Sequence, residues 1–416
     1  MKKRINDLIK HPLMSGGIIM VGGNMVANVV NYLYHLVMGR VLGPVDYGVL
    51  ASLYSIMYLI GVVPLSASVS IVKFISSAKD QEVYSIYSSI NIFVTKLAII
   101  ASVLFLICSP FIAGFLHITN MWTVVLLVPV LFFTLATLVN QATAQGLLKF
   151  AGTVIPTLFS SLTKFLLGIA LVFMGWSVFG AMVGVVFGIA LAFLYSRWFV
   201  RRLLKKNKIR LLSLKPFIAY SFPVLIQALA FTSLFTVDVI LVKHFFSPHD
   251  AGIYAALSTL GKVIFFASSP ITATMFPIVS KRKSNKESYN KIFLMSLLII
   301  LVVGVLITSF YWLFPSVAIG ALYGAAYLSA ESALVWMGLF ILFYSLSFLL
   351  VNYALSLGDS KVVYYPFIAA ILQAPMIWFF HSSLLQVIQI SFTISVAMFV
   401  FLGAYLGYNH LRKSYE

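Results

Sequence analysis

The chain has 416 residues, of which 62% are hydrophobic and only 9% are charged. A soluble domain carries about a quarter charged residues, so this composition excludes an ordinary soluble protein and indicates one that crosses a membrane many times. The net charge of +18 has two possible explanations, which are binding to nucleic acid and the topology of a membrane protein. The distribution of the charges along the chain decides between them. Cys108 is the only cysteine, so we expect no internal disulfide and no cysteine-based metal cluster. We predict no other metal site and no cofactor.

Apolar stretches long enough to cross about 30 Å of hydrocarbon follow one another along the chain. We predict about twelve membrane spans, near 13–39, 47–76, 84–108, 121–140, 152–174, 178–199, 216–242, 251–279, 290–314, 329–355, 361–380 and 384–408. The first follows Lys2, Lys3 and Arg4 and resembles a signal sequence. Because no small-residue cleavage site follows it, we interpret it as a retained span.

The lysines and arginines collect on one side of the predicted membrane. With the N-terminus in the cytoplasm, 22 of the 28 fall in cytoplasmic segments, and only Arg40 and Lys243 fall in outer loops. This bias sets the orientation of membrane proteins, so both termini are predicted to be cytoplasmic. The positive charge is thereby explained by topology, and nucleic acid is not an expected partner.

Two pairs of segments repeat at similar offsets. GRVLGPVDYGVLASL at 39–53 matches KHFFSPHDAGIYAAL at 243–257, and LVNQATAQGLLK at 138–149 matches LVNYALSLGDSK at 350–361. The offsets of 204 and 212 residues relate equivalent loops of two halves. We therefore predict an all-α fold of two six-helix lobes, related by a pseudo-twofold axis along the membrane normal around a central cavity.

The predicted organisation has three parts. Residues 1–200 form an N-terminal lobe, 201–215 a basic cytoplasmic linker and 216–416 a C-terminal lobe. The first repeated pair contains the pattern Pro-x-Asp-x-Gly. We interpret its proline and glycine as a tight turn, and Asp46 and Asp250 as caps of the helices that follow.

A column of polar residues interrupts the first apolar span. Asn24, Asn28, Asn31 and His35 are spaced four, three and four residues apart, which places them on one face of a helix. Asparagine in a membrane helix can bind a neighbouring helix or line a wet cavity. We favour the cavity, and we include Arg40, near the outer end of the same span, among the candidate binding residues.

Four further lysines lie within predicted spans: Lys73, Lys96, Lys164 and Lys262. A charge at the bilayer centre costs roughly 2.5–3.5 kcal/mol, so such residues face water or an anionic group. Lys73 lies near a cytoplasmic end, where it could reach the interface instead. The neighbours that share a helix face with these lysines are hydroxyl residues: Ser66 and Ser70, Thr153, Thr157 and Ser160, and Ser258 and Ser269. Serine and threonine can equally bond their own backbone or another helix.

Asp238 is an acid in the outer part of the predicted span 216–242, on the same predicted helix face as Gln227. It is either a coupling residue that titrates during transport or the partner of a lysine, and both interpretations stay open. A cavity lined by lysines, amides and hydroxyls suits a substrate with phosphate and many hydroxyl groups.

The segment MGRVLGPVDYGVLASLYSI at 38–56 resembles the polysaccharide transporter family, the oligosaccharide and O-antigen flippases of the multidrug/oligosaccharidyl-lipid/polysaccharide exporter superfamily. The resemblance implies a non-enzymatic protein that flips a polyprenyl-pyrophosphate-linked oligosaccharide by alternating access for surface polysaccharide biosynthesis. It implies a multi-pass protein of the bacterial or archaeal cytoplasmic membrane, surrounded by membrane lipids. A polysaccharide polymerase and glycosyltransferases are the expected functional partners.

Three alternatives remain open. A cation-coupled drug or metabolite antiporter of the same superfold needs a carboxylate in the first lobe, where the predicted spans offer asparagine instead. A lipid II flippase handles a substrate with the same diphosphate chemistry. A membrane polymerase or glycosyltransferase needs a large extramembrane loop or paired catalytic acids, and the sequence offers neither.

Overall fold

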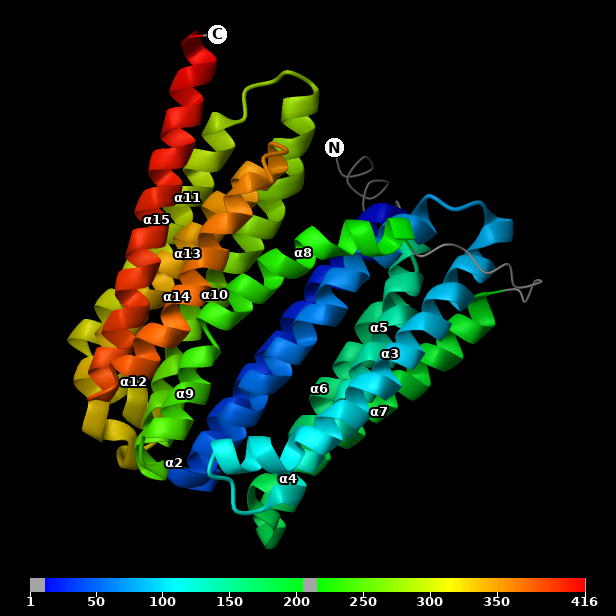
Figure 1. The fold of residues 1–416 in the computed structure, drawn as a ribbon. Coiled ribbons are helices and arrows are strands. Elements are labelled where there is room, and N and C mark those ends of the chain that lie inside the picture. Colours follow the sequence, from blue (N-terminus) through cyan, green and yellow to red (C-terminus); the bar gives the residue numbers. More distant parts are fainter. Residues whose placement is uncertain (1–11, 205–214, 416) are drawn as a thin grey trace, which may run out of the picture. The chain divides into compact units, whose positions relative to one another are not determined.

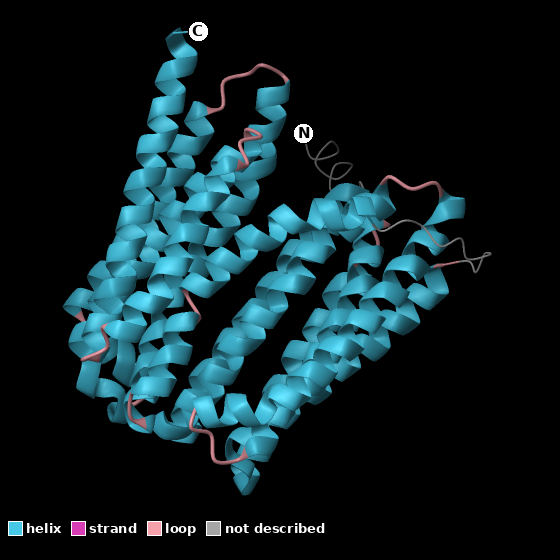
Figure 2. Cartoon of the chain, viewed as in Figure 1, coloured by secondary structure: helices cyan, strands magenta, loops and turns pink. Residues whose placement is uncertain are grey.

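The computed structural model describes residues 12–204 and 215–415, and its elements are labelled in Figure 1. Every regular element in these ranges is helical, which confirms the predicted all-α class (Figure 2). The elements are α2 (Pro12–Ser76), α3 (Asp80–Phe115), α4 (Met121–Val125), α5 (Leu127–Gly146), α6 (Ala151–Leu171), η1 (Val172–Trp176), α7 (Ser177–Leu203), α8 (Lys215–Leu234), α9 (Val237–Phe245), α10 (Pro248–Ser284), α11 (Asn290–Leu313), α12 (Pro315–Leu322), η2 (Ala325–Ala333), α13 (Leu334–Ser356), η3 (Lys361–Val363), α14 (Tyr364–Phe379) and α15 (Leu384–Tyr415).

The described residues contain nine helices long and apolar enough to cross a membrane, or ten with the bent pair α8 and α9. Two of the nine candidate helices extend over 55 and 53 residues. At about 1.5 Å per residue, each is more than twice the thickness of a bilayer core. Both are broken near their middle, at Gly43 (φ 72°) and at Gly175 (φ 88°). Each therefore holds two of the predicted spans.

The two Pro-x-Asp-x-Gly segments begin their helices differently. Ser247 is the N-terminal cap of α10: its hydroxyl accepts a hydrogen bond from the backbone nitrogen of Asp250 at 3.1 Å and donates to Asp250 Oδ2 at 2.8 Å. The prediction that Asp250 is the cap is therefore wrong, because Ser247 caps the helix and Asp250 lies in its first turn, where its carboxylate accepts a hydrogen bond from the cap hydroxyl. In the first repeat, Gly43 stands at the position of Ser247, and its positive φ turns the chain instead.

The seventh predicted span is broken as well. Helices α8 and α9 meet at an angle of 41°, and the backbone oxygen of Leu234, at the end of α8, accepts a hydrogen bond from Gln373 Nε2 at 2.9 Å. The side chain thus satisfies a carbonyl that the break removes from the helical ladder. Gln227 and Asp238 lie on different sides of the break, so the prediction that they share one helix face is wrong.

Residue contacts divide the chain into two compact units. Unit 1 contains residues up to 42 and 56–228, and unit 2 contains 43–55 and 229–416. The predicted boundaries at 200 and 216 lie in the sequence between two predicted spans. The two units, in contrast, are defined by contacts between residues in the structure. Most of the predicted linker, residues 205–214, lies outside the described residues, and the division into lobes at 201–215 stays a prediction.

Within unit 1, small residues bring α6 and α7 close together. A Cβ added at Gly184 would lie 2.6 Å from the backbone of Gly168, and one at Gly188 would lie 2.6 Å from the backbone oxygen of Ser160. Close approach at glycine is how membrane helices gain packing contacts in the absence of a hydrophobic driving force. A polar chain also links three helices, because Tyr87 of α3 donates to Asn140 of α5 at 2.9 Å and Asn140 donates to Ser196 of α7 at 3.3 Å.

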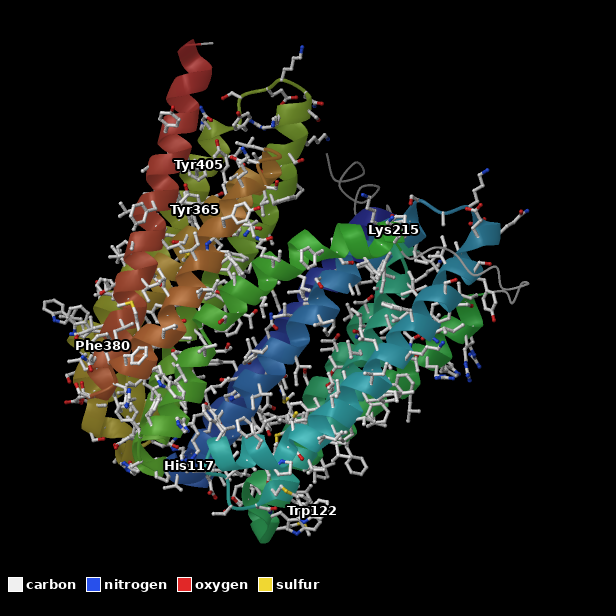
Figure 3. All side chains as sticks on the ribbon, in the orientation of Figure 1. His117, Trp122, Lys215, Tyr365, Phe380 and Tyr405 are labelled. Carbon is white, nitrogen blue, oxygen red and sulfur yellow. The ribbon has the colours of Figure 1, made fainter. Side chains whose placement is uncertain are left out.

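Within unit 2, helices α10, α11, α13 and α15 surround a shared core. Tyr311 donates to the backbone oxygen of Leu260 at 2.8 Å, and Tyr344 donates to that of Phe231 at 3.0 Å, so buried tyrosines satisfy carbonyls of adjacent helices. Near one end, Tyr405 donates to Asp359 at 2.9 Å and its ring lies 5.5 Å from that of Tyr365 (Figure 3).

The ends of unit 1 differ in character. Figure 3 shows His117 and Trp122 at one end and Lys215 at the other. Trp122 is largely exposed, as is typical of aromatic residues at a membrane interface. The lysine end is the one that the charge distribution assigns to the cytoplasm, and that orientation stays a prediction.

Candidate functional site

Lys164 of α6 is buried in unit 1, with 9% of its surface exposed. Its ammonium lies 4.8 Å from the ring centroid of Tyr34 on α2, which is the geometry of a cation–π contact. Tyr34 is held in place because its hydroxyl donates to the backbone oxygen of Ala181 at 3.3 Å. The structure therefore places the predicted Lys164 beside α2. The predicted His35 follows Tyr34 in the sequence, and its ring packs edge-on against that of Tyr34.

The asparagine column lies beside this contact, on the flank of the packed face of α2. The buried face of that helix is formed by Ala27, Tyr34 and Met38. Asn28 is exposed, whereas Asn24 and His35 are half-buried. Asn31 is half-buried too, and its Oδ1 is a buried oxygen with no hydrogen-bond partner. The column is thus exposed at Asn28, half-buried at its other three positions, and borders the helix contact at Asn31 and His35.

The hydroxyl residues before Lys164 have a different role. Gln141 of α5 donates from Nε2 to the backbone oxygen of Thr153 and to Thr157 Oγ1, both at 3.1 Å, and Thr153 Oγ1 donates to the backbone oxygen of Gln141 at 3.0 Å. These bonds join α5 to α6. The helix-contact interpretation, which the sequence left open, therefore holds for Thr153 and Thr157.

The remaining predicted residues of α2 and α3 are exposed in unit 1. Lys96 of α3 lies on a surface with the exposed apolar residues Ile92, Ile99 and Ile100. Lys73 lies in the last turn of α2, and Arg40 lies three residues before the break in that helix. The structure does not bring Lys96 next to Lys164, although the sequence assigned both to one cavity. Their roles in binding stay predictions.

In unit 2, Lys262 of α10 is buried close to an acid. Its ammonium lies 5.0 Å from the ring centroid of Phe235, at the break between α8 and α9, and it interacts electrostatically with Asp238 of α9. Asp238 is fully buried and accepts a hydrogen bond from Tyr254 at 2.7 Å. Pairing of Asp238 with a lysine is one of the two interpretations left open by the sequence analysis, and neither of them identifies Tyr254. That contact joins residues on either side of the turn before α10.

A second group that sequence reasoning missed is a tyrosine cluster. The hydroxyl of Tyr47, in the segment 43–55, lies 3.0 Å from Thr259 Oγ1 and 3.2 Å from the hydroxyl of Tyr323. Tyr327 completes the cluster with its ring edge-on to Tyr47. The only signal in the sequence was the position of Tyr47 inside the repeated segment.

The fold is shared with known membrane transporters. The structure matches an inward-facing multidrug resistance MATE family transporter of the MOP superfamily with a TM-score of 0.71 at 12% identity, covering 91% of this chain and 94% of that one. It matches the lipid II flippase MurJ in an inward closed conformation with a TM-score of 0.77 at 13% identity, covering 94% and 87%. A MOP superfamily transporter from Pyrococcus furiosus, described by the reverse polarity of its binding pocket, gives 0.59 at 13% identity, covering 95% of each chain.

These similarities show that the chain shares the fold of these transporters, and its long apolar helices make it a multi-pass membrane protein. The sequence comparison then gives the family, since residues 37–332 match the model of the polysaccharide biosynthesis protein family. The chain belongs to that family, and the resemblance seen in the segment 38–56 is confirmed. A search of curated proteins finds no matching sequence.

Proposed function

We propose that the protein is a flippase that moves a polyprenyl-pyrophosphate-linked oligosaccharide across the cytoplasmic membrane by alternating access, for surface polysaccharide biosynthesis. Membership of the polysaccharide biosynthesis family supports the pathway, and the fold supports a transport step. The polymerase and glycosyltransferases that would make and use such a substrate are the functional partners of this proposal.

The buried ammonium of Lys164 carries the proposal. Lys164 lies on α6 beside Tyr34 of α2, and residues 83–237 of the sequence contain no Asp or Glu. A lysine buried within a membrane span is a candidate binding group for an anionic substrate, and a diphosphate is such an anion. Lysine acts as a point charge toward phosphate, while the accessible amides of Asn24 and Asn28 suit sugar hydroxyls.

Alternating access would begin with entry of the substrate into this site. The diphosphate would enter beside Lys164 from the cytoplasmic side, with the polyprenyl chain remaining in lipid. Lys73 would offer a further cation in unit 1, where Lys96, Arg40 and His35 stand as secondary candidates, and Lys262 is the candidate cation of unit 2. Asp238 is our proposed coupling residue, because a buried carboxylate that faces both Tyr254 and Lys262 can change its charge when the surrounding helices move.

Helices α5, α6 and α7, which contain no Asp or Glu, also separate this proposal from a drug antiporter. A cationic drug would need an acid, whereas the charged side chains of these helices are Lys164 and the arginines of α7. Lipid II carries the same diphosphate and stays an alternative substrate. The two flippases differ in which lipid-linked intermediate accumulates when transport stops.

The test is export in cells that carry Lys164→Met or Lys164→Arg. We expect Lys164→Met to cause lipid-linked oligosaccharide to accumulate in the inner leaflet and surface polysaccharide to fall at equal protein level, with partial recovery for Lys164→Arg. The exposed Lys281→Met serves as the matched control. Normal export by Lys164→Met would contradict the proposal. Accumulation of lipid II alone would assign the protein to the alternative substrate.

A further inference from the structure

A surface groove of about 480 Å³ lies at the C-terminal end of α7, in unit 1. It is lined by Phe193, Leu194, Arg197, Trp198, Arg201 and Arg202. The groove thus combines three guanidinium groups with three large apolar side chains. It lies at the end of the helix that the charge distribution predicts to be cytoplasmic, and it is separate from Lys164, which is buried on α6.

The three arginines are not paired with acids. Within the described residues, none of them forms an ion pair with a carboxylate. Arg202 stacks over the ring of Trp198 at 4.3 Å, and Arg197 lies 5.6 Å from the ring centroid of Phe193. These aromatic contacts hold the guanidinium planes in place while leaving their N–H groups available.

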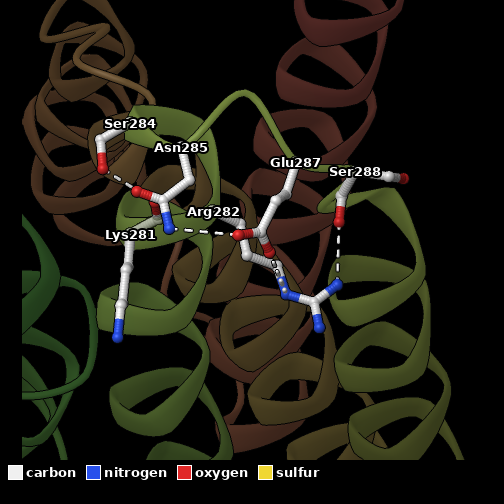
Figure 4. Close-up of polar contacts among 6 residues, drawn as sticks. All are labelled: Lys281, Arg282, Ser284, Asn285, Glu287 and Ser288. Atoms are coloured by element: carbon white, nitrogen blue, oxygen red, sulfur yellow. Dashed lines mark hydrogen bonds and ion pairs between the residues drawn. The ribbon is translucent and has the colours of Figure 1, made fainter.

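The contrast with a second basic segment, at the end of α10, is informative. Arg282 donates to the backbone oxygen of Ser288 at 2.9 Å and lies 4.0 Å from Glu287, so its charge stabilises the turn to α11 (Figure 4). Asn285 donates to the same Glu287 at 3.1 Å. Both segments satisfy the positive-inside pattern, but within the described residues Arg282 has an acidic partner and the three α7 arginines do not.

An apolar stripe leads from this groove along α7. Phe187, Leu191, Leu194 and Trp198 are spaced four, three and four residues apart, and each is at least 44% exposed. This spacing places them on one helix face. Because an exposed apolar face of a membrane helix is covered by lipid chains, the stripe and the groove together offer a chain-contacting surface that ends in three cations.

We propose that this groove is a binding site for an anionic phospholipid of the cytoplasmic leaflet. The phosphodiester is held by Arg197, Arg201 and Arg202, an acyl chain lies along Leu191 and Leu194, and Trp198 sits at the boundary between chain and headgroup. Guanidinium pairs with phosphate through charge-assisted hydrogen bonds, and basic pockets at the cytoplasmic ends of membrane helices suit anionic headgroups. The apolar stripe distinguishes this ligand from a free phosphate ion, which would leave it unused.

The test measures lipid binding to the purified full chain by native mass spectrometry, with phosphatidylglycerol and phosphatidylcholine of equal chain length as probes. We expect a preference for phosphatidylglycerol that falls about tenfold or more in the triple variant Arg197→Gln, Arg201→Gln, Arg202→Gln. The control triple variant, Lys281→Gln, Lys286→Gln, Lys291→Gln, removes the same charge from exposed positions in and around the turn between α10 and α11 and should retain the preference. Equal loss in both triples, or no preference in the native protein, would overturn the proposal.

Further arms separate the groove from other anion sites. Leu194→Gln leaves every charge in place, so it keeps the topology signal and should still weaken phosphatidylglycerol binding. Glycerophosphoglycerol, which is the phosphodiester of phosphatidylglycerol without its acyl chains, should bind far more weakly than the lipid. If it binds equally well, the site recognises an anion alone and the proposal fails. If undecaprenyl diphosphate displaces phosphatidylglycerol at lower concentration and loses binding in the arginine triple, the groove is a substrate site instead.

Discussion

Gly48 and Gly252, which occupy the same position in the two repeated segments, lie against each other. A Cβ added at Gly48 would lie 2.8 Å from the backbone nitrogen of Gly252. A twofold axis brings equivalent residues into contact where two related elements cross. Within unit 2, the segment 43–55 and α10 therefore meet at equivalent positions of the two repeated sequences. This is the contact expected if a local pseudo-twofold axis relates the two segments.

This contact predicts a strong effect of small substitutions at the crossing. Gly252→Ala places a Cβ against the backbone oxygen of Pro44, and Gly48→Ala places one against the backbone of α10. Overpacking of a fixed backbone costs about 1–3 kcal/mol or more, so both variants should unfold at lower temperature in detergent. Gly61→Ala is the matched control, because nothing lies within 4 Å of its added Cβ. Equal melting temperatures for Gly252→Ala and Gly61→Ala would contradict the close contact.

A second prediction concerns Asp238 and Lys262. Asp238→Asn removes the negative charge that faces the buried Lys262, so we expect destabilisation on the order of 1 to 3 kcal/mol. Lys262→Met in the same chain removes the uncompensated charge and should restore part of the stability. The measurement is a double-mutant cycle by thermal unfolding. If the two substitutions are additive, the electrostatic coupling is absent.

A third prediction separates helix contact from substrate contact. Gln141→Leu removes the bonds to Thr153 and Thr157, and hydrogen bonds between membrane helices contribute about 0.6 kcal/mol on average and up to about 1.7. We expect a modest loss of thermal stability and unchanged export of surface polysaccharide, and the same for Thr157→Val. Loss of export with unchanged stability would show that this side chain binds substrate.

A fourth prediction addresses the tyrosine cluster. Tyr47→Phe removes a hydroxyl that contacts both Thr259 and Tyr323, at a cost of about 1 kcal/mol. Tyr323→Phe removes one end of the same pair. Because the two substitutions delete one shared contact, the double variant should lose less stability than the sum of the singles. If the stability losses of the two single variants add up in the double variant, the hydroxyl of Tyr323 stabilises the protein through contacts other than that with Tyr47.

Sequence pattern predicted the spans well where length and hydrophobicity decide, because a bilayer fixes how long an apolar stretch must be. The predicted 290–314 is α11 (Asn290–Leu313), and the predicted 361–380 is η3 with α14. The break after Leu234 was not visible, since its residues are as apolar as the helices around it. Helix α12 was not predicted either, because eight residues are too few to form a span.

For the site, spacing gave the helix face but not what that face meets. Thr153, Thr157 and Lys164 share a face of α6, yet the threonines contact Gln141 and the lysine contacts Tyr34. Lys96, like Lys164, lies near the middle of its predicted span, but in the structure it lies on an exposed apolar surface. Which neighbours each lysine meets is set by glycine-mediated packing between helices, and that information is distributed over segments far apart in the chain.

The exchange of segments between the two units bears on how the protein can be assembled from pieces. A chain severed within 205–214 would yield a C-terminal fragment without 43–55, against which Gly252 and Thr259 pack, and an N-terminal fragment without 215–228. Each fragment would leave partner surfaces uncovered, so neither half is a self-sufficient folding unit. The ribosome therefore synthesises the segment 43–55 before the helices of unit 2 against which it packs. Its packing can be completed only after the second half of the chain has been translated.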